Sequence, residues 1–156
     1  SQSLEIVEKT LTKMAQGGIH DQIGGGFHRY STDTYWLVPH FEKMLYDNAL
    51  ISKLFIHAYQ VTQNPIYKDT ADDILTYLRS EMLSDEGLFY ASQDADSEGE
   101  EGKYYTWQLS ELKQLMDPAE MALLTGILNV SKMNSKVSDD ILSAQCKSSS
   151  MIINAL

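Results

Sequence analysis

Apolar residues recur every three or four positions along two neighbouring stretches, and this period is the strongest constraint on the fold. The stretches run over residues 39–62 and 65–83, and Asn64-Pro65 interrupts the pattern between them. The apolar positions are Met44, Ile51, Leu54, Phe55, Ala58 and Val61 in the first stretch, and Tyr67, Ala71, Ile74, Leu78 and Met82 in the second. We therefore expect two consecutive helices, with Pro39 in the first turn of the first one.

Further helices are expected on either side of this pair. A helix with one apolar stripe precedes it and ends before Gly17. The stripe consists of Leu4, Val7, Leu11 and Met14. Ser110 is expected to cap a helix over residues 110–116, and Pro118 to begin another that ends near residue 128. The pattern predicts an all-α class of helical hairpins joined by loops.

A short β insertion interrupts the helices. The segments "GLFYAS" and "KYYTW" are aromatic and prone to form strands, and the acidic "QDADSEGEEG" lies between them. We expect these segments to form a small β-hairpin with a long acidic loop. Residues 131–150 are rich in serine and poor in large apolar groups, which predicts a divergent, poorly ordered tail over residues 129–156. The helical domain is thus expected to cover residues 1–128.

Composition limits the classes of function. A chain of 156 residues with 43% hydrophobic and 22% charged residues can bury the core of one domain. A net charge of −10 repels phosphate backbones and anionic lipid surfaces, so we expect neither a nucleic acid nor a membrane as partner. The chain has no apolar run of about 18 residues, the length that a membrane helix needs. The single cysteine, Cys146, excludes an internal disulfide and favours the cytoplasm.

The block "GGIHDQIGGGFHRYSTDTYWLVPHFEKMLYDNAL", residues 17–50, holds the densest set of chemically capable side chains. Five glycines lie within its first ten residues. They match neither a dinucleotide fingerprint nor a P-loop, because a helix precedes them and no GK[ST] follows. Two interpretations remain open: a tight structural turn, or a loop whose backbone passes close to a ligand. The second interpretation expects four side chains of the loop to point inward: His20, Asp21, His28 and Arg29.

The start of the predicted 39–62 helix is polar where its apolar stripe would continue. Lys43 and Asp47 are spaced to pair with each other, and His40 lies three residues before Lys43. A buried face that opens into polar groups beside the glycine loop is typical of a pocket mouth. A local ion pair at a capped helix start is the alternative.

Five carboxylates lie within residues 94–101. Asp94 and Asp96 fall on one side of an extended segment, with Cα atoms roughly 6–7 Å apart. Such a pair can act as acid and base on a sugar, hold a cation or an arginine, or belong to a solvated loop. An EF-hand is excluded because its position twelve is Tyr105, and we predict no metal and no cofactor. Arg29 is the expected counter-charge for Asp94 or Asp96.

Together, the glycine block and "GLFYASQDADSEGEEGKYYTW" resemble the spermatogenesis-associated protein 20 family and its bacterial YyaL-type relatives over roughly residues 4–116. The resemblance implies a thioredoxin-like domain followed by an (α/α) toroid similar to six-hairpin glycosidases and N-acylglucosamine 2-epimerases. The chain would then be a fragment: a partial (α/α) toroid with a small β-hairpin insertion. The loops over residues 17–38 and 88–107 would face its central cleft.

These observations lead to one functional expectation and one alternative. The expectation is a segment that binds or processes carbohydrate, with Asp94 or Asp96 as acid or base and His28 and His40 assisting. The expected sugar-binding side chains are Arg29, Tyr30, Trp36, Glu42, Lys43, Tyr46, Asp47 and Tyr105, with Phe89, Tyr90, Tyr104 and Trp107 suited to stacking or ordinary packing. The alternative is a non-catalytic interaction or scaffold module of a thioredoxin-domain protein.

The resemblance also implies missing helices. The apolar faces at Leu54, Ile74 and Leu78 would then be uncovered, so we expect self-association or pairing with the missing part of the toroid.

Overall fold

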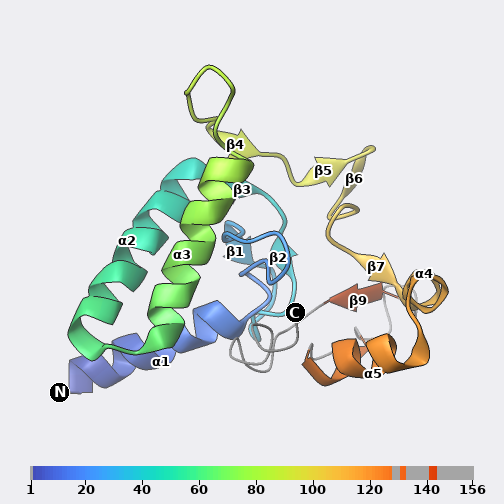
Figure 1. The fold of residues 1–156 in the computed structure, drawn as a ribbon, viewed down its shortest axis with the longest axis horizontal. Coiled ribbons are helices and arrows are strands. Elements are labelled where there is room, and N and C mark those ends of the chain that lie inside the picture. The colour runs from blue at the N-terminus through green and yellow to red at the C-terminus, as the bar shows by residue number, and fades with distance from the viewer. Residues whose placement is uncertain (1, 128–130, 133–140, 144–156) are drawn as a thin grey trace.

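A computed structural model describes residues 2–127, 131–132 and 141–143 (Figure 1). Its helices are α1 (Gln2–Gln16), α2 (Leu45–Thr62), α3 (Pro65–Ser80), α4 (Leu109–Leu115) and α5 (Pro118–Ile127). Helices α2 and α3 lie side by side as a hairpin, α1 packs against α3, and α4 and α5 lie at the other end of the molecule (Figure 1). The predicted helical pair and the helix before Gly17 are confirmed. No helix in the described part of the chain is long and apolar enough to cross a membrane.

Short antiparallel strands connect the loops. The pairs are β1 (Tyr30–Ser31) with β2 (Pro39–His40), β3 (Lys43–Met44) with β4 (Ser92–Gln93), β5 (Asp96–Ser97) with β6 (Glu100–Glu101), and β9 (Ile141–Ser143) with both β7 (Trp107–Gln108) and β8 (Ser131–Lys132). The fold is therefore helical with small strand pairs. The predicted tail, residues 129–156, lies outside the described residues except for β8 and β9, and the predicted domain division stays a prediction.

The prediction that Pro39 begins a helix is wrong. His40 pairs with Tyr30 and Lys43 pairs with Gln93, so residues 39–40 and 43–44 lie in strand pairs and not in a helix. The backbone is still extended at Met44, and α2 begins at Leu45. Tertiary pairing overrides the local preference of proline for a first helical turn.

The predicted hairpin between residues 87–92 and 103–107 is also wrong. Strand β4 pairs with β3 instead, next to the start of α2. The hairpin that forms, β5–β6, is short and lies inside the acidic segment. Glu98 and Gly99 take positive φ angles of 54° and 79° at its turn, a conformation that a glycine adopts at little cost.

Local hydrogen bonds explain where the remaining helices begin. The side chain of Asn64 accepts from the backbone of Ile66 and caps α3 ahead of its first-turn proline. Ser110 is not the cap of α4, because that helix starts one residue earlier at Leu109. The Glu111 carboxylate accepts instead from the backbone N–H of Gln108 at 2.8 Å.

The core is built from α1, α2, α3 and the glycine loop. Its largest fully buried apolar residues are Leu11, Phe27, Phe55, Tyr67, Ile74, Tyr77 and Met82. Ile74 and Leu78 are therefore not on an uncovered face, contrary to the expectation, because α1 and α2 pack against α3 and both side chains belong to the core. Leu54 is 45% exposed, as expected for an uncovered face.

Candidate functional site

The glycine loop folds back onto α3. His20 and Phe27 form a β-bridge across it, and Gly25 and Gly26 both have positive φ, at 77° and 74°. A Cβ on Gly26 would collide with the ring of Tyr77. Glycine is thus required here both for the backbone angle and for the close approach to the helix.

His20 fastens this loop to the helices. Its Nδ1 lies 2.9 Å from the carbonyl oxygen of Ala15, and its Nε2 lies 2.8 Å from an Asp73 carboxylate oxygen. Both partners are acceptors, and the side-chain amide of Gln22 also lies 3.2 Å from Nδ1. The same Asp73 oxygen accepts from the backbone N–H of Gly26 at 3.2 Å. His20 therefore ties the loop to α1 and α3.

A buried ion pair lies under the loop. Lys43 is 1% exposed, and its Nζ donates to Asp21 at 2.8 Å and to the Gly25 carbonyl at 2.7 Å. The ammonium also lies 4.4 Å from the ring centroid of Tyr77 and 5.1 Å from that of Tyr105, as in a cation–π contact. Lys43 is thus held on all sides by groups that stabilise its charge.

The ion pair replaces the predicted pairing of Lys43 with Asp47. Lys43 precedes the helix in β3, so the helical spacing that would bring the two together does not apply. Burial lowers the pKa of Lys43, and the charge of Asp21 opposes this shift. Burial raises the pKa of Asp21, but Lys43 and the N–H groups of Ile23 and Gly24 outweigh it, and the net pKa is lowered.

Asn48 is a second buried polar connection between α2 and the loop. Its side-chain oxygen accepts from the backbone N–H of Phe27 at 2.7 Å, and its amide donates to the Phe27 carbonyl at 3.0 Å. This side chain holds the backbone directly before His28. Asn48 cannot be recognised from the sequence, since nothing in its spacing distinguishes it from an ordinary helix residue.

His28 is buried with one ring nitrogen fixed. Its Nδ1 donates to the Phe41 carbonyl at 3.0 Å, and the ring packs against the edges of Phe41 and Tyr105. Burial, together with the charge of Lys43, lowers the pKa of His28 to about 4. The imidazole is therefore neutral near pH 7, with its proton on Nδ1 and an acceptor lone pair on Nε2. That Nε2 has no hydrogen-bond partner among the described residues.

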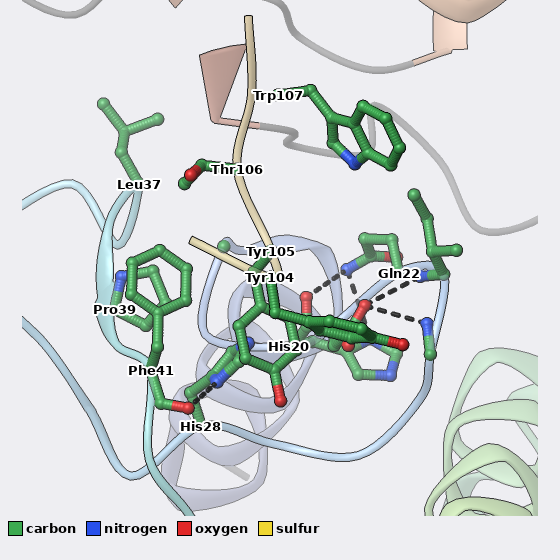
Figure 2. A pocket seen from close by; sticks show the side chains of 14 residues that line it. His20, Gln22, His28, Leu37, Pro39, Phe41, Tyr104, Tyr105, Thr106 and Trp107 are labelled. Atoms are coloured by element: carbon green, nitrogen blue, oxygen red, sulfur yellow. Dashed lines mark hydrogen bonds between the residues drawn. The ribbon is translucent and has the colours of Figure 1, made fainter. Parts of the chain in front are cut away.

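A cavity of about 250 Å³ opens beside His28. Residues from three segments line it: Asp21, Gln22, Ile23 and His28 from the glycine loop, Leu37, Pro39 and Phe41 from the next segment, and Tyr104, Tyr105, Thr106 and Trp107 from the end of the acidic insertion. Figure 2 shows Leu37, Pro39 and Phe41 on one side and Gln22 and Trp107 on the other. The arrangement is apolar and aromatic with a few polar groups, which is typical of a small-molecule site.

A second group of predicted residues lies at an edge outside the lining of this pocket. Arg29 donates to Glu42 at 2.9 Å, and His40 lies 3.5 Å from the same carboxylate oxygen. The other ring nitrogen of His40 lies 2.6 Å from Glu101 in the acidic hairpin. Tyr30 stacks on His40 at a centroid distance of 5.0 Å. The two sequence blocks therefore meet at this edge through His40 and Glu101, as they also do through the β3–β4 pair, and not through Arg29.

The predicted pairing of Arg29 with Asp94 or Asp96 is wrong, because the guanidinium of Arg29 forms its ion pair with Glu42 instead. Asp94 and Asp96 are both exposed, and neither lines the pocket. The Asp94 carboxylate accepts from the backbone N–H of Asp96 at 3.2 Å. The structure thus separates these carboxylates from His28.

The remaining predicted residues have other positions. Trp36 is half-buried against the core, and its carbonyl accepts from the Gly18 N–H at 2.6 Å. Tyr46 is exposed on α2. Asp47 follows it, and burial raises the pKa of its carboxyl. Of the predicted sugar-binding side chains, Tyr105 lines the pocket and Lys43 lies against its ring.

The sequence signal for the other pocket residues was partial. The spacing of Asp21 and Gly24 indicates an aspartate turn, and the aromatic run at 104–107 indicates a stacking surface. Phe89 and Tyr90, from the other aromatic segment, line none of this pocket.

Fold and pocket together define a helical-hairpin chain with a glycine-loop site, and comparison with known proteins agrees with the sequence resemblance. No protein-family model matches the chain. It is 44% identical over 122 residues to Spermatogenesis-associated protein 20 of Mus musculus and to that of Homo sapiens, a match that covers 74% of this chain. Uncharacterized protein B0495.5 of Caenorhabditis elegans is 41% identical over 123 residues, or 73% of this chain.

The chain belongs to the spermatogenesis-associated protein 20 family. The match covers 15% of the mouse relative, 16% of the human one and 17% of the Caenorhabditis elegans one. The chain thus spans about a sixth of the length of these relatives.

Proposed function

We propose that this chain is part of a carbohydrate-binding or carbohydrate-processing (α/α) toroid and that a sugar binds in the pocket beside His28. The observation that carries the proposal is an imidazole acceptor set among aromatic rings. Tyr104 and Trp107 offer faces for the apolar side of a sugar ring, and Nε2 of His28 accepts from a hydroxyl. The helical hairpin α2–α3 and the family resemblance support the toroid.

His28 is also the proposed base for glycosidase- or epimerase-like chemistry. A neutral imidazole with a free Nε2 can take a proton from a bound hydroxyl or an acidic carbon. Burial raises the pKa of Tyr105, so its hydroxyl stays protonated and can donate beside His28. Asp94, Asp96 and His40 enter such a reaction only if the hairpin that carries or contacts them moves towards the pocket.

The test is a titration of the chain with a panel of hexoses, N-acetylhexosamines and uronic acids, followed by calorimetry. Saturable binding is expected. The variant His28→Gln keeps a donor for the Phe41 carbonyl but removes the imidazole base, and it should weaken binding at least about tenfold, a loss of about 1.4 kcal/mol. His57 is exposed on α2, so His57→Gln is the matched control and should bind as the wild type does. Absence of saturable binding across the panel contradicts the proposal.

A specific observation favours the second candidate, an interaction module. Helix α2 carries exposed apolar residues at helical spacing: Tyr46, Leu50, Leu54 and Val61 are 49%, 66%, 45% and 68% exposed. In the proposed toroid, further helices of the longer polypeptide, or a second copy of the chain, would cover this face. Light scattering across a concentration series tests self-association, and Leu50→Lys should abolish it if this face is the contact.

A further inference from the structure

Two segments, residues 17–46 and 92–108, build the pocket, and they contain three lysines and arginines: Arg29, Lys43 and Lys103. None of the three lines the pocket among its described residues. Each one contacts a carboxylate. Arg29 pairs with Glu42, and Lys103 pairs with Glu98.

Lys43 is the one of these cations that lies directly beneath the pocket. Its four partners are an Asp21 oxygen, the Gly25 carbonyl and the faces of two tyrosine rings. Only 1% of the surface of Lys43 is exposed, so these partners enclose its ammonium and keep it from contacting a ligand in the pocket. Rearranging it would leave the mostly buried Asp21 carboxylate without its counter-charge, which is strongly unfavourable.

The two pocket histidines supply no free positive charge either. Both ring nitrogens of His20 are already bonded, to Ala15 and to the Asp73 carboxylate. His28 is uncharged near pH 7 because burial and Lys43 keep its pKa near 4. Its Nε2 offers a lone pair, which repels a carboxylate or phosphate oxygen and attracts a hydroxyl.

The wider surroundings repel anions as well. The acidic insertion that carries one wall of the pocket holds five carboxylates within residues 94–101. The whole chain has a formal net charge of −10. The field at the pocket mouth therefore lowers the local concentration of anionic ligands.

We infer that the pocket selects uncharged sugars and excludes uronates and sugar phosphates. This inference rests on the proposed function and narrows it to a substrate class. The basis is the engagement of every cationic side chain on the pocket segments by a carboxylate, together with an acceptor lone pair on His28. A neutral sugar needs hydrogen-bond partners for its hydroxyls and apolar surface for the faces of its ring, and the pocket offers both, in Nε2 of His28 and in the rings of Tyr104 and Trp107.

The experiment compares three ligands of the same ring size by calorimetry at pH 7: glucose, glucuronate and glucose 6-phosphate. The expected result is saturable binding of glucose, with glucuronate and glucose 6-phosphate at least about tenfold weaker at low salt. The difference should shrink in 0.5 M salt, because screening weakens the repulsion.

One substitution should reverse the selection. Ile23 lines the pocket but is 78% exposed, so its replacement does not disturb the core. Ile23→Arg should raise the affinity for glucuronate at least about fivefold, whereas the uncharged Ile23→Gln should not. Circular dichroism confirms that both variants are folded.

The outcomes separate the two claims. Equal or tighter binding of glucuronate or glucose 6-phosphate by the wild type overturns the charge selection and leaves the sugar-binding proposal standing. An unchanged affinity of Ile23→Arg for glucuronate also counts against the inference, since it shows that charge at this pocket does not govern binding. Failure of all three ligands to bind overturns the proposed function and the inference with it.

Discussion

The neutral state of His28 has a consequence for stability that can be worked out from its surroundings. In the unfolded chain an imidazole has its ordinary pKa of 6.5, and in the folded chain the pKa is about 4. As the pH falls from 6.5 towards 4, His28 binds a proton in the unfolded state but stays neutral in the folded state. The free energy of unfolding therefore decreases over this window.

The magnitude follows from the shift. A difference of about 2.5 pKa units corresponds to about 3 kcal/mol at 1.36 kcal/mol per unit. Stability from this group is fully present above pH 6.5 and is lost as the pH falls to 4. Because His28 is 4% exposed, solvent screening does little to reduce the effect.

The assay is urea unfolding from pH 4 to pH 8 for the wild type and for His28→Gln. Other groups titrate in this window, so the quantity compared is the difference between the two curves. The wild type should lose about 3 kcal/mol more than the variant between pH 6.5 and pH 4. His57→Gln, at an exposed position, should follow the wild type. Parallel curves for wild type and His28→Gln would refute the burial of a neutral imidazole.

Three further outcomes are expected. Gly26→Ala should cost more than about 2 kcal/mol in chemical denaturation, because its Cβ meets a ring, whereas Gly99→Ala, at a similar φ with open space around it, should cost about 1 kcal/mol; equal losses contradict the close approach. Lys43→Met should destabilise the fold by about 3 kcal/mol by leaving Asp21 uncompensated, and a neutral effect would show that the pair is dispensable. Arg29→Met should leave the urea midpoint of unfolding close to that of the wild type, since water screens the half-exposed guanidinium, and a clearly lower midpoint would indicate a structural role.

The helices could be predicted from the sequence because their apolar period is local. The stripe through Tyr67, Ile74 and Leu78 places α3 and its buried face without any knowledge of its neighbours. The start of α2 could not be placed in the same way. Strands of two residues carry no detectable period, so nothing local shows that Pro39 and Lys43 pair with distant segments.

The residue types that form the site could be predicted from the sequence, but not which side chains pair with one another. Glycines beside chemically capable residues indicated a close backbone approach, and Gly26 makes one, against Tyr77 on α3. The partner of Lys43 lies 22 residues away, and that of His40 lies 61 residues away. Such pairings depend on how the loop folds against the helices, which the spacing of charges along the chain does not reveal.

In the proposed binding mode a sugar hydroxyl contacts Nε2 of His28. The most direct measurement is the imidazole ¹⁵N chemical shift of His28 during a titration with glucose at pH 7. We expect a saturable shift of the Nε2 resonance, since a bound hydroxyl donates to it, while Nδ1 stays protonated on the Phe41 carbonyl and the exposed His57 does not change. An Nε2 resonance that stays constant up to saturating glucose would show that no sugar hydroxyl contacts His28.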